Sequence, residues 1–236
     1  MNDDGTFKLN SDHVSATGAA LANASIMWGT AGLFTWIVPA DVYEISSSGC
    51  GAGGGGQGTY GFGGGSGECA LALKLAVIPG ETLTINVGAG GAGSPVSSSL
   101  ADSTPGGNGG NTTITGSFGT ITLQGGYGGL STTYLPGESG GPGGQRGGFP
   151  CVAKTGSDGR IIRIGGKGAD GLFGFGGQGG IYAPVLGDLG SYWNNGTGGL
   201  GWGAGGGGGG NDPAKPASGG GKGADGMVRI EYQVTA

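Results

Sequence analysis

Hydrophobic and β-branched residues occur in short runs along the chain, and glycine-rich runs separate them. Most of the apolar runs have the length of a β-strand and end at glycine or proline. In residues 69–80, every second residue from Leu71 to Val77 is a large aliphatic, which predicts a strand with one apolar face. The predicted strands are 34–39, 42–49, 69–80, 82–88, 111–116, 119–126, 160–166 and 227–234.

The glycine-rich runs have a repeat of three residues. From Gly165, the sequence GGKGADGLFGFGGQGGIY has glycine at every third position as far as Gly180, and residues 49–67 and 137–148 are similar. Helices repeat every 3.6 residues and strands every two, so neither explains this spacing. A polyproline II backbone has three residues per turn and no internal hydrogen bonds, so its buried backbone groups must pair with neighbouring segments. A flexible glycine-rich linker is the alternative interpretation.

Together, the two patterns predict an all-β fold, a jelly-roll-like β-sandwich that carries packed polyglycine-II-type helices formed by the glycine-rich runs. The start of the chain differs, because residues 15–28 (SATGAALANASIMW) are rich in alanine and serine. We expect a short helix or an extended arm there. The predicted division is an N-terminal attachment or linker segment, residues 1–30, and a glycine-rich β-sandwich domain, residues 31–236.

Composition narrows the range of functions. The chain has 236 residues with 67 glycines, yet four Trp, seven Tyr and seven Phe indicate a folded protein. A net charge of −5, with ten dispersed Lys and Arg residues, argues against a nucleic-acid partner. No apolar run is long enough to span a membrane, and the N-terminus has no secretion signal. We therefore expect synthesis in a cytosol, where the protein either stays or from which it is released inside an assembled particle or by lysis.

Few residues suggest metal binding or catalysis. Residues 165–173 and 220–228 resemble a calcium-binding repeat, but they are not in tandem, so we expect Asp170 and Asp225 to act in turns without a metal. The only histidine, His13, is far from any nucleophile in sequence, and no enzyme activity or cofactor is expected.

The chain has three cysteines, Cys50, Cys69 and Cys151. Their number is odd and they lack the CxxC spacing of a zinc site. We expect buried free thiols, and a Cys50–Cys69 disulfide that closes the intervening glycine run is the alternative.

Aromatic residues in polar segments are the candidate binding residues, because they bring a large contact area at a small rotamer cost. The segment GSYWNNGTG, residues 190–198, carries two of them beside two asparagines and breaks the three-residue phase. The alternative for Trp193 is a position in the core, and Phe173, Phe175 and Trp202 are expected to cover the glycine layer. The predicted receptor site comprises Tyr192, Trp193, Asn194 and Asn195, with Tyr134 and Tyr182 as flanking contacts.

An ordered series of motifs resembles a known family. The series begins with FTWIVPADVYEI, GCGAGGGGQG and PGETLTINVGAGGAG, continues with GGNTTITGSFGTITLQGGYGG and ends with GGGKGADGMVRIEY. Over about residues 30–236, it is similar to the glycine-rich domain at the C-terminal ends of tailed-bacteriophage tail fibres and related virion proteins. Its glycine runs also resemble those of phage fibre-tip adhesins and of some receptor kinases.

The resemblance implies a non-catalytic virion tail protein that binds the host surface through loops at the ends of the glycine helices. The implied partners are a host glycan or an outer-membrane or pilus protein, and other virion tail proteins. The resemblance also implies a homotrimer. Insertion into a membrane is not expected. A purely structural virion component is the alternative, and an ice-binding protein, which would need regular flat Thr or Ala faces, is a third.

Overall fold

The structure is a computed structural model and describes residues 21–58, 61–96, 104–130, 136–138, 144–149, 151–155, 161–180, 182–183, 192–193, 195–210 and 218–235. Every regular element in these residues is a β-strand, which confirms the all-β class. The same residues therefore include no helix of the length and hydropathy that would cross a membrane.

The strands are, in chain order, β1 (Leu21–Trp28), β2 (Gly32–Ile37), β3 (Glu44–Cys50), β4 (Cys69–Ala76), β5 (Thr82–Val87), β6 (Thr112–Gly116), β7 (Gly119–Leu123), β8 (Cys151–Thr155), β9 (Ile161–Ile164), β10 (Phe173–Phe175), β11 (Tyr182–Ala183), β12 (Tyr192–Trp193), β13 (Leu200–Trp202) and β14 (Met227–Thr235). Each of the eight predicted strands is found, with its ends moved by a few residues. The prediction missed β1, β8 and the four short strands β10 to β13.

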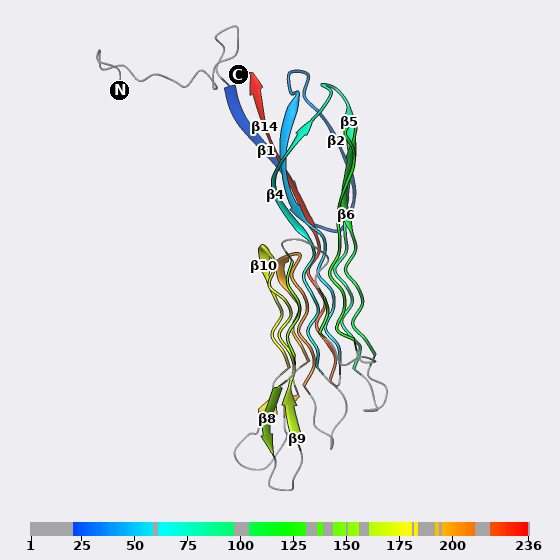
Figure 1. The fold of residues 1–236 in the computed structure, drawn as a ribbon, viewed down its shortest axis with the longest axis vertical. Helices are drawn as coiled ribbons and strands as arrows, with labels where there is room; N and C mark the ends of the chain where they lie inside the picture. Colours follow the sequence, from blue (N-terminus) through cyan, green and yellow to red (C-terminus); the bar gives the residue numbers. More distant parts are fainter. Residues whose placement is uncertain are drawn as a thin grey trace, which may run out of the picture.

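Two four-stranded antiparallel sheets, of strand orders β1-β14-β3-β4 and β2-β5-β6-β7, lie face to face at one end of the molecule (Figure 1). Their alternation follows the sequence: in β5, Leu83, Ile85 and Val87 are buried, and the polar residues between them are exposed. The arrangement is sandwich-like, with one apolar core between the sheets. The core comprises Val38, Val42, Ile45, Leu75, Val77, Leu83, Ile85, Val87, Ile114, Val228 and Ile230.

Strand β1 corrects the expectation for the start of the chain. Residues 21–28 are extended, which was one of the two alternatives, but they form an edge strand that pairs with β14 along its whole length, from Leu21 opposite Thr235 to Trp28 opposite Val228. Ile26 and Trp28 pack against the core. The alanines and serines of this segment concealed the strand, because they weaken the alternation that marks one. The sandwich therefore includes part of the segment expected to stand apart.

Strand β4 departs from the predicted single apolar face. Leu75 and Val77 are buried, whereas Leu71 is 60% exposed and Leu73 is 37% exposed. The register between β3 and β4 shifts between Ser47 and Gly49. Opposite this shift, Ala72 has a φ of 50°, in the left-handed region, and its N–H donates to Ser48 Oγ at 3.0 Å. This irregularity interrupts the two-residue alternation between Leu73 and Ala70, so Leu71 no longer keeps the phase of Leu75.

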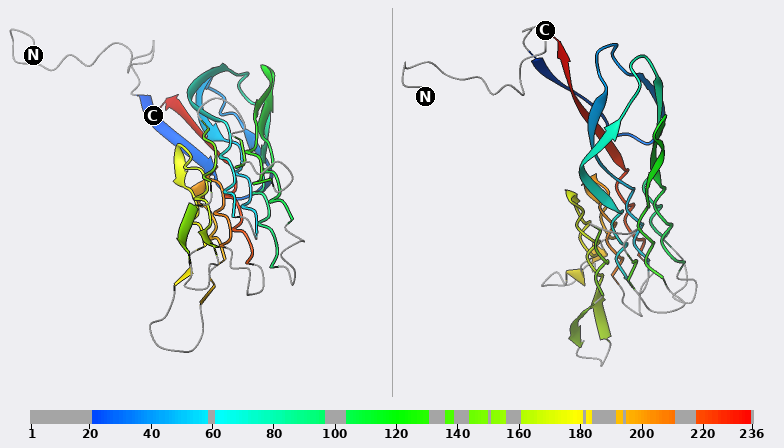
Figure 2. Two further views of the ribbon diagram at one scale, coloured as in Figure 1. Left: turned by 60° about the horizontal axis from the view of Figure 1, so that its bottom comes forward. Right: turned by 45° about the horizontal axis from the view of Figure 1, so that its top comes forward.

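Beyond the sandwich, the glycine-rich segments run side by side as an array (Figures 1 and 2). Residues 51–57 lie in its interior, and each successive N–H bonds to a different neighbour. The partner changes with a period of three residues, so that the donors to any one neighbour are three residues apart. Gly51, Gly54 and Gln57 donate to residues 62–68, Ala52 and Gly55 donate to residues 107–110, and Gly53 and Gly56 donate to residues 221–224, all at 2.8–3.1 Å.

The carbonyls of residues 51–57 have the same period. They accept hydrogen bonds from three further segments, so this stretch is bonded to six neighbours in all. Buried backbone groups are thus paired without any regular sheet, as buried polar groups require. Ala52 and Gly55 accept from Gly126 and Gly129, Gly53 and Gly56 accept from Gly91 and Ser94, and Gly54 and Gln57 accept from Gly206 and Gly209, at 2.8–3.0 Å.

The close approach of these segments explains the absence of side chains. A Cβ added to Gly54 would lie 2.1 Å from the carbonyl oxygen of Tyr127, and one added to Gly56 would lie 2.0 Å from that of Gly207. Ordinary van der Waals contacts of a Cβ begin near 3.4 Å. Only glycine permits this spacing at these positions.

Three small sheets complete the described structure. Strands β8 and β9 form an antiparallel pair at the end of the array opposite the sandwich, here called the distal end (Figure 1). Strands β11 and β12 form another, and β11 contacts β9. Strands β10 and β13 pair where the array meets the sandwich. The described chain starts and finishes at the sandwich end, since Leu21 is opposite Thr235.

Candidate functional site

Three of the six predicted site residues come together in one short sheet near the distal end. Tyr182 of β11 is directly opposite Trp193 of β12, and Ala183 is opposite Tyr192. Eight residues of sequence separate the two strands, and the sequence pattern did not predict that they pair. Two other predicted residues, Tyr134 and Asn194, lie outside the described residues.

Asn195, the sixth predicted residue, has a structural bond. Its side-chain oxygen accepts a hydrogen bond of 2.9 Å from the N–H of Gly219. Two residues later, Thr197 is bonded to Gln178 twice: the Thr197 hydroxyl accepts from the Gln178 N–H at 2.8 Å, and the Thr197 N–H donates to the Gln178 carbonyl at 3.0 Å. The chain that follows β12 is therefore fastened to two glycine-rich segments, which places Asn195 in a positioning role.

Phe149 is an exposed aromatic that the predicted site did not include. It precedes β8, is 58% exposed, and packs edge-on against the buried Phe62, with ring centroids 6.0 Å apart and an interplanar angle of 72°. Phe62 follows the turn between residues 51–58 and 61–68, and the N–H of Gly61 in this turn donates to the Gly58 carbonyl. A large aromatic next to a glycine run was the available signal, and Phe149 joins the candidate residues.

The aromatic residues expected to cover the glycine layer behave differently from one another. Trp202 is half-buried and its indole N–H donates to the Gly29 carbonyl at 2.9 Å. Phe173 is also half-buried, but Phe175 is 73% exposed, opposite Leu200 of β13, which is 70% exposed. The expectation was wrong for Phe175, because the short β10–β13 pair turns this position towards solvent.

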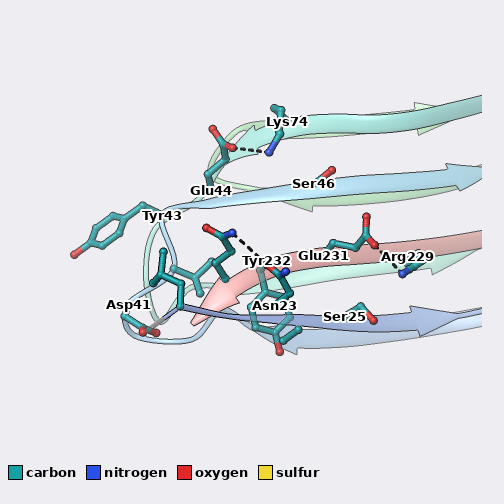
Figure 3. Close-up of a pocket in the computed structure, with 14 residues that line it drawn as sticks. Asn23, Ser25, Asp41, Tyr43, Glu44, Ser46, Lys74, Arg229, Glu231 and Tyr232 are labelled. Atoms are coloured by element: carbon teal, nitrogen blue, oxygen red, sulfur yellow. Dashed lines mark hydrogen bonds and ion pairs between the residues drawn. The ribbon is translucent and has the colours of Figure 1, made fainter. Parts of the chain in front are cut away.

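A polar hollow of about 670 Å³ lies on the outer face of the β1-β14-β3-β4 sheet (Figure 3). Its charged side chains are exposed and pair with one another: Lys74 with Glu44 at 2.9 Å, and Arg229 with Glu231 at 2.7 Å. The Asp41 carboxylate accepts from the Thr235 N–H at 2.7 Å, which lowers its pKa. Exposed pairs of this kind contribute little energy, and the hollow is the solvated face of a sheet, with Tyr43 at its rim.

The two aspartates of the calcium-like motifs hold the chain in place. Asp170 accepts hydrogen bonds from Lys167 Nζ at 2.7 Å and from the Gly176 N–H at 2.8 Å, and these two contacts lower its pKa. Asp225 is more enclosed. Within the described part of the chain, no group of three or more His, Cys, Asp or Glu residues could hold a metal ion. His13 lies outside that part.

The Asp225 carboxylate ties three separate segments together. One oxygen accepts from the Gly90 N–H at 2.8 Å and from Lys222 Nζ at 3.1 Å, and the other accepts from the Ala31 N–H at 3.3 Å. Burial alone would raise the pKa of Asp225, but the hydrogen bonds from Gly90, Lys222 and Ala31 outweigh it and lower the pKa. This aspartate is therefore an ionic anchor between the array and the sandwich.

Comparison with known proteins is consistent with this architecture. A family model described as a glycine-rich domain matches residues 29–233, which covers the sandwich from β2 onwards and the whole described array. A search of curated proteins found no match. The chain therefore belongs to the glycine-rich domain family.

Proposed function

We propose that this protein is a tail-fibre or tail-tip component of a bacteriophage virion, an adhesin that binds the host-cell surface without catalysis. The observation that carries the proposal is the bonding of residues 51–57 to six neighbours. A backbone bonded on all sides forms a stiff support between the sandwich and the distal strands. The order of the sequence motifs, which resembles that of phage tail-fibre domains, supports the assignment to a virion.

We also infer that the glycine-rich segments are polyglycine-II-type helices. A helix with three residues per turn rotates each N–H by one third of a turn relative to the one before it. This rotation agrees with the change of partner at every residue of 51–57 and with the return to the same partner after three. Backbone dihedral angles measured by NMR would test this assignment: φ of about −75° and ψ of about +145° support it.

The receptor site of this proposal lies at the distal end. Tyr182, Tyr192 and Trp193 are its centre, Asn195 positions the chain after them, and Asn194 and Tyr134 are the further candidates from the sequence. Aromatic rings stack on the apolar faces of sugars, and amides bond to the sugar hydroxyls, so a host-surface glycan is the favoured partner. The anchored segment after β12 supports a binding site at this place, because a rigid support reduces the entropy lost on binding.

Attachment to the virion then belongs to the sandwich end, where Leu21 and Thr235 lie. The other virion tail proteins would contact this end, and a homotrimer would place three distal ends together. The protein would be made in the host cytoplasm and released by lysis. A structural tail component without a receptor remains the alternative, and binding to cells separates the two.

The test compares the Trp193→Ala, Tyr192→Ala double variant with a Tyr43→Ala control in binding to host cells and to a panel of envelope mutants. Tyr43 is 70% exposed on the sandwich, so its removal controls for the loss of an exposed aromatic ring. We expect the double variant to lose at least ~30-fold in affinity, about 2 kcal/mol, with Tm unchanged. Full binding by the folded double variant would refute this site, and loss of binding by Tyr43→Ala would move the site to the polar hollow.

A second candidate function, ice binding, is favoured by one observation. The outer face of the β2-β5-β6-β7 sheet presents rows of threonines, which the sequence argument required for this function. By their pairing, neighbours in a row are about 4.8 Å apart, and successive rows are about 6.8 Å apart. One row comprises Thr35, Thr84, Thr115 and Thr120, and the next includes Thr113 and Thr122.

Regularly spaced hydroxyl and methyl groups can hold water in an ice-like order on such a face. Asn86 and the exposed Leu33 complete the second row, and the exposed Ile37 lies beside the rows on the same face. Thermal hysteresis measured on the wild type and on Thr84→Lys tests this function: wild-type activity that the substitution removes would support it. Absence of hysteresis in the wild type would exclude it.

A further inference from the structure

Two cysteines face each other where the sandwich passes into the glycine array. Cys50 is the last residue of β3, Cys69 is the first residue of β4, and the two are direct partners in the antiparallel register. The next pair along, Gly51 and Glu68, is joined by a hydrogen bond of 2.9 Å from the Gly51 N–H to the Glu68 carbonyl. Because bonded and non-bonded pairs alternate in antiparallel strands, Cys50 and Cys69 occupy the closer, non-bonded kind.

This geometry suits a disulfide. Non-bonded pairs have Cα atoms about 4.5 Å apart, and disulfides span Cα separations of roughly 4.4–6.8 Å. Both thiols are free in the structure, as the sequence predicted, although only Cys50 is fully buried. Cys69 is half-buried, so a small reagent can reach it without unfolding the core.

The surroundings give the two thiols different roles. Cys50 lies beneath Gly203, where an added Cβ would be 2.8 Å from its sulfur. A hydrogen bond from the Cys50 thiol, the largest cause, and one from the Leu172 backbone together lower the pKa of Cys69 to about 7, although burial and the charge of Glu68 oppose them. The same contact with Cys69, together with burial, raises the pKa of Cys50. Cys69, whose sulfur is the more accessible and whose pKa is lowered, is therefore the better nucleophile of the two.

We propose that Cys50 and Cys69 form a reversible redox clip in which Cys69 reacts first and Cys50 closes the disulfide. The oxidant is a low-molecular-weight disulfide such as oxidised glutathione. The Cys69 thiolate attacks one of its sulfurs, and the first glutathione leaves as a thiolate. Cys50 then loses its proton and attacks the Cys69 sulfur, which displaces the second glutathione. The protein gives up two electrons and two protons, and the oxidant becomes two molecules of reduced glutathione.

The clip would close the ends of the hairpin formed by residues 51–57 and 61–68. This hairpin lies in the interior of the array, where residues 51–57 have their six bonded neighbours. A bridge across it constrains the unfolded chain and is expected to raise Tm by roughly 6–12 °C for a protein of this size. A reducing cytosol keeps the clip open, and an oxidising exterior closes it. This inference does not depend on the adhesin proposal.

The experiment uses the full chain in defined ratios of reduced to oxidised glutathione. Cys151→Ser is the matched control, because Cys151 lies in β8, outside the sheet that holds the pair. Intact mass, peptide mapping and Tm are the readouts. We expect the wild type and Cys151→Ser to form a Cys50–Cys69 bridge, and Cys50→Ala to stop at a glutathione adduct on Cys69.

Several outcomes would overturn the proposal. The first is a folded Cys151→Ser protein that keeps both thiols reduced in oxidised glutathione. The second is an adduct on Cys50 in Cys69→Ala together with no adduct on Cys69 in Cys50→Ala. If the buried Cys50 cannot be replaced without unfolding, the order in which the two wild-type thiols are alkylated tests which of them reacts first. Faster labelling of Cys69 supports the assignment, and faster labelling of Cys50 contradicts it.

Discussion

Gly53→Ala is the most direct test of the packed array. Gly53 is buried in the middle of residues 51–57, and a Cβ there would lie 2.0 Å from the carbonyl oxygen of Ala204 and 2.3 Å from its carbon. The atoms that the Cβ would meet belong to the backbone, so no side-chain rotation can relieve the contact. Either Gly53 or Ala204 must move by more than 1 Å to restore an ordinary contact near 3.4 Å.

The cost follows from the hydrogen bonds that this movement disturbs. The Gly53 N–H donates to the Ala224 carbonyl at 2.9 Å, the Gly53 carbonyl accepts from Gly91 at 2.8 Å, and the Ala204 carbonyl accepts from the Ala224 N–H at 2.8 Å. Weakening two or three buried bonds at about 1–2 kcal/mol each costs roughly 3–5 kcal/mol. Alanine also reduces the entropy of the unfolded chain, which offsets about 0.4–1 kcal/mol. The expected net loss is about 2–4 kcal/mol, or a fall in Tm of roughly 5–15 °C.

Calorimetry on purified protein measures this change, with Gly198→Ala as the matched control. Gly198 is exposed in the same array, and an added Cβ would have a single neighbour, the Lys222 carbonyl oxygen at 3.3 Å. We expect Gly198→Ala to change Tm by less than ~3 °C. Equal Tm values for Gly53→Ala and the wild type would show that residues 51–57 are not packed as the structure describes.

Three further predictions concern the anchors and the bulge. Asp225→Asn should lower the free energy of unfolding by about 1.5–3 kcal/mol at pH 7. The folded-state pKa of Asp225 is lowered, so the carboxylate stabilises the fold above its unfolded pKa of about 3.9, and this stabilisation fades below that pH. Unfolding free energies of the variant and the wild type, from urea titrations, should therefore converge near pH 2. Chelation should leave Tm unchanged, and a fall that calcium reverses would show that Asp170 or Asp225 binds a metal. Ala72→Gly should raise Tm by ~1–3 °C, because Ala72 has a φ of 50°, a left-handed conformation that is strained for alanine but not for glycine. The control Ala76→Gly in the same strand should lower Tm. A fall in Tm for Ala72→Gly would contradict the assigned strain.

The strands of the sandwich were largely predictable, because burial on one face imposes a two-residue alternation that survives in the sequence. Strand β5 illustrates this, with Leu83, Ile85 and Val87 buried at alternate positions. The prediction failed where contacts with a neighbouring strand, and not the alternation itself, determine the structure. Strand β1 exists because β14 offers it a full row of hydrogen-bonding groups, and Leu71 is exposed because the strand is irregular at Ala72.

The candidate site was predictable only in part. The polar segment around Tyr192 and Trp193 stands out in the sequence, but its pairing with Tyr182 does not, because two-residue strands are too short to show an alternating pattern. The bond from Gly219 to Asn195 likewise joins residues far apart in sequence. Local composition does not encode such contacts, since they arise only once the array has assembled.

The period of three was contained in the sequence itself. Gly165, Gly168 and Gly171 donate to the carbonyls of Gly180, Gly177 and Gly174, so the spacing read along the chain is the spacing of the bonds. Glycine at these places is a steric requirement of close backbone contact, which acts residue by residue and therefore leaves a local trace. The choice of partners leaves none, because one glycine run is chemically the same as another. Only the tertiary structure, through the sandwich strands that set where each run begins and ends, decided which six segments surround residues 51–57.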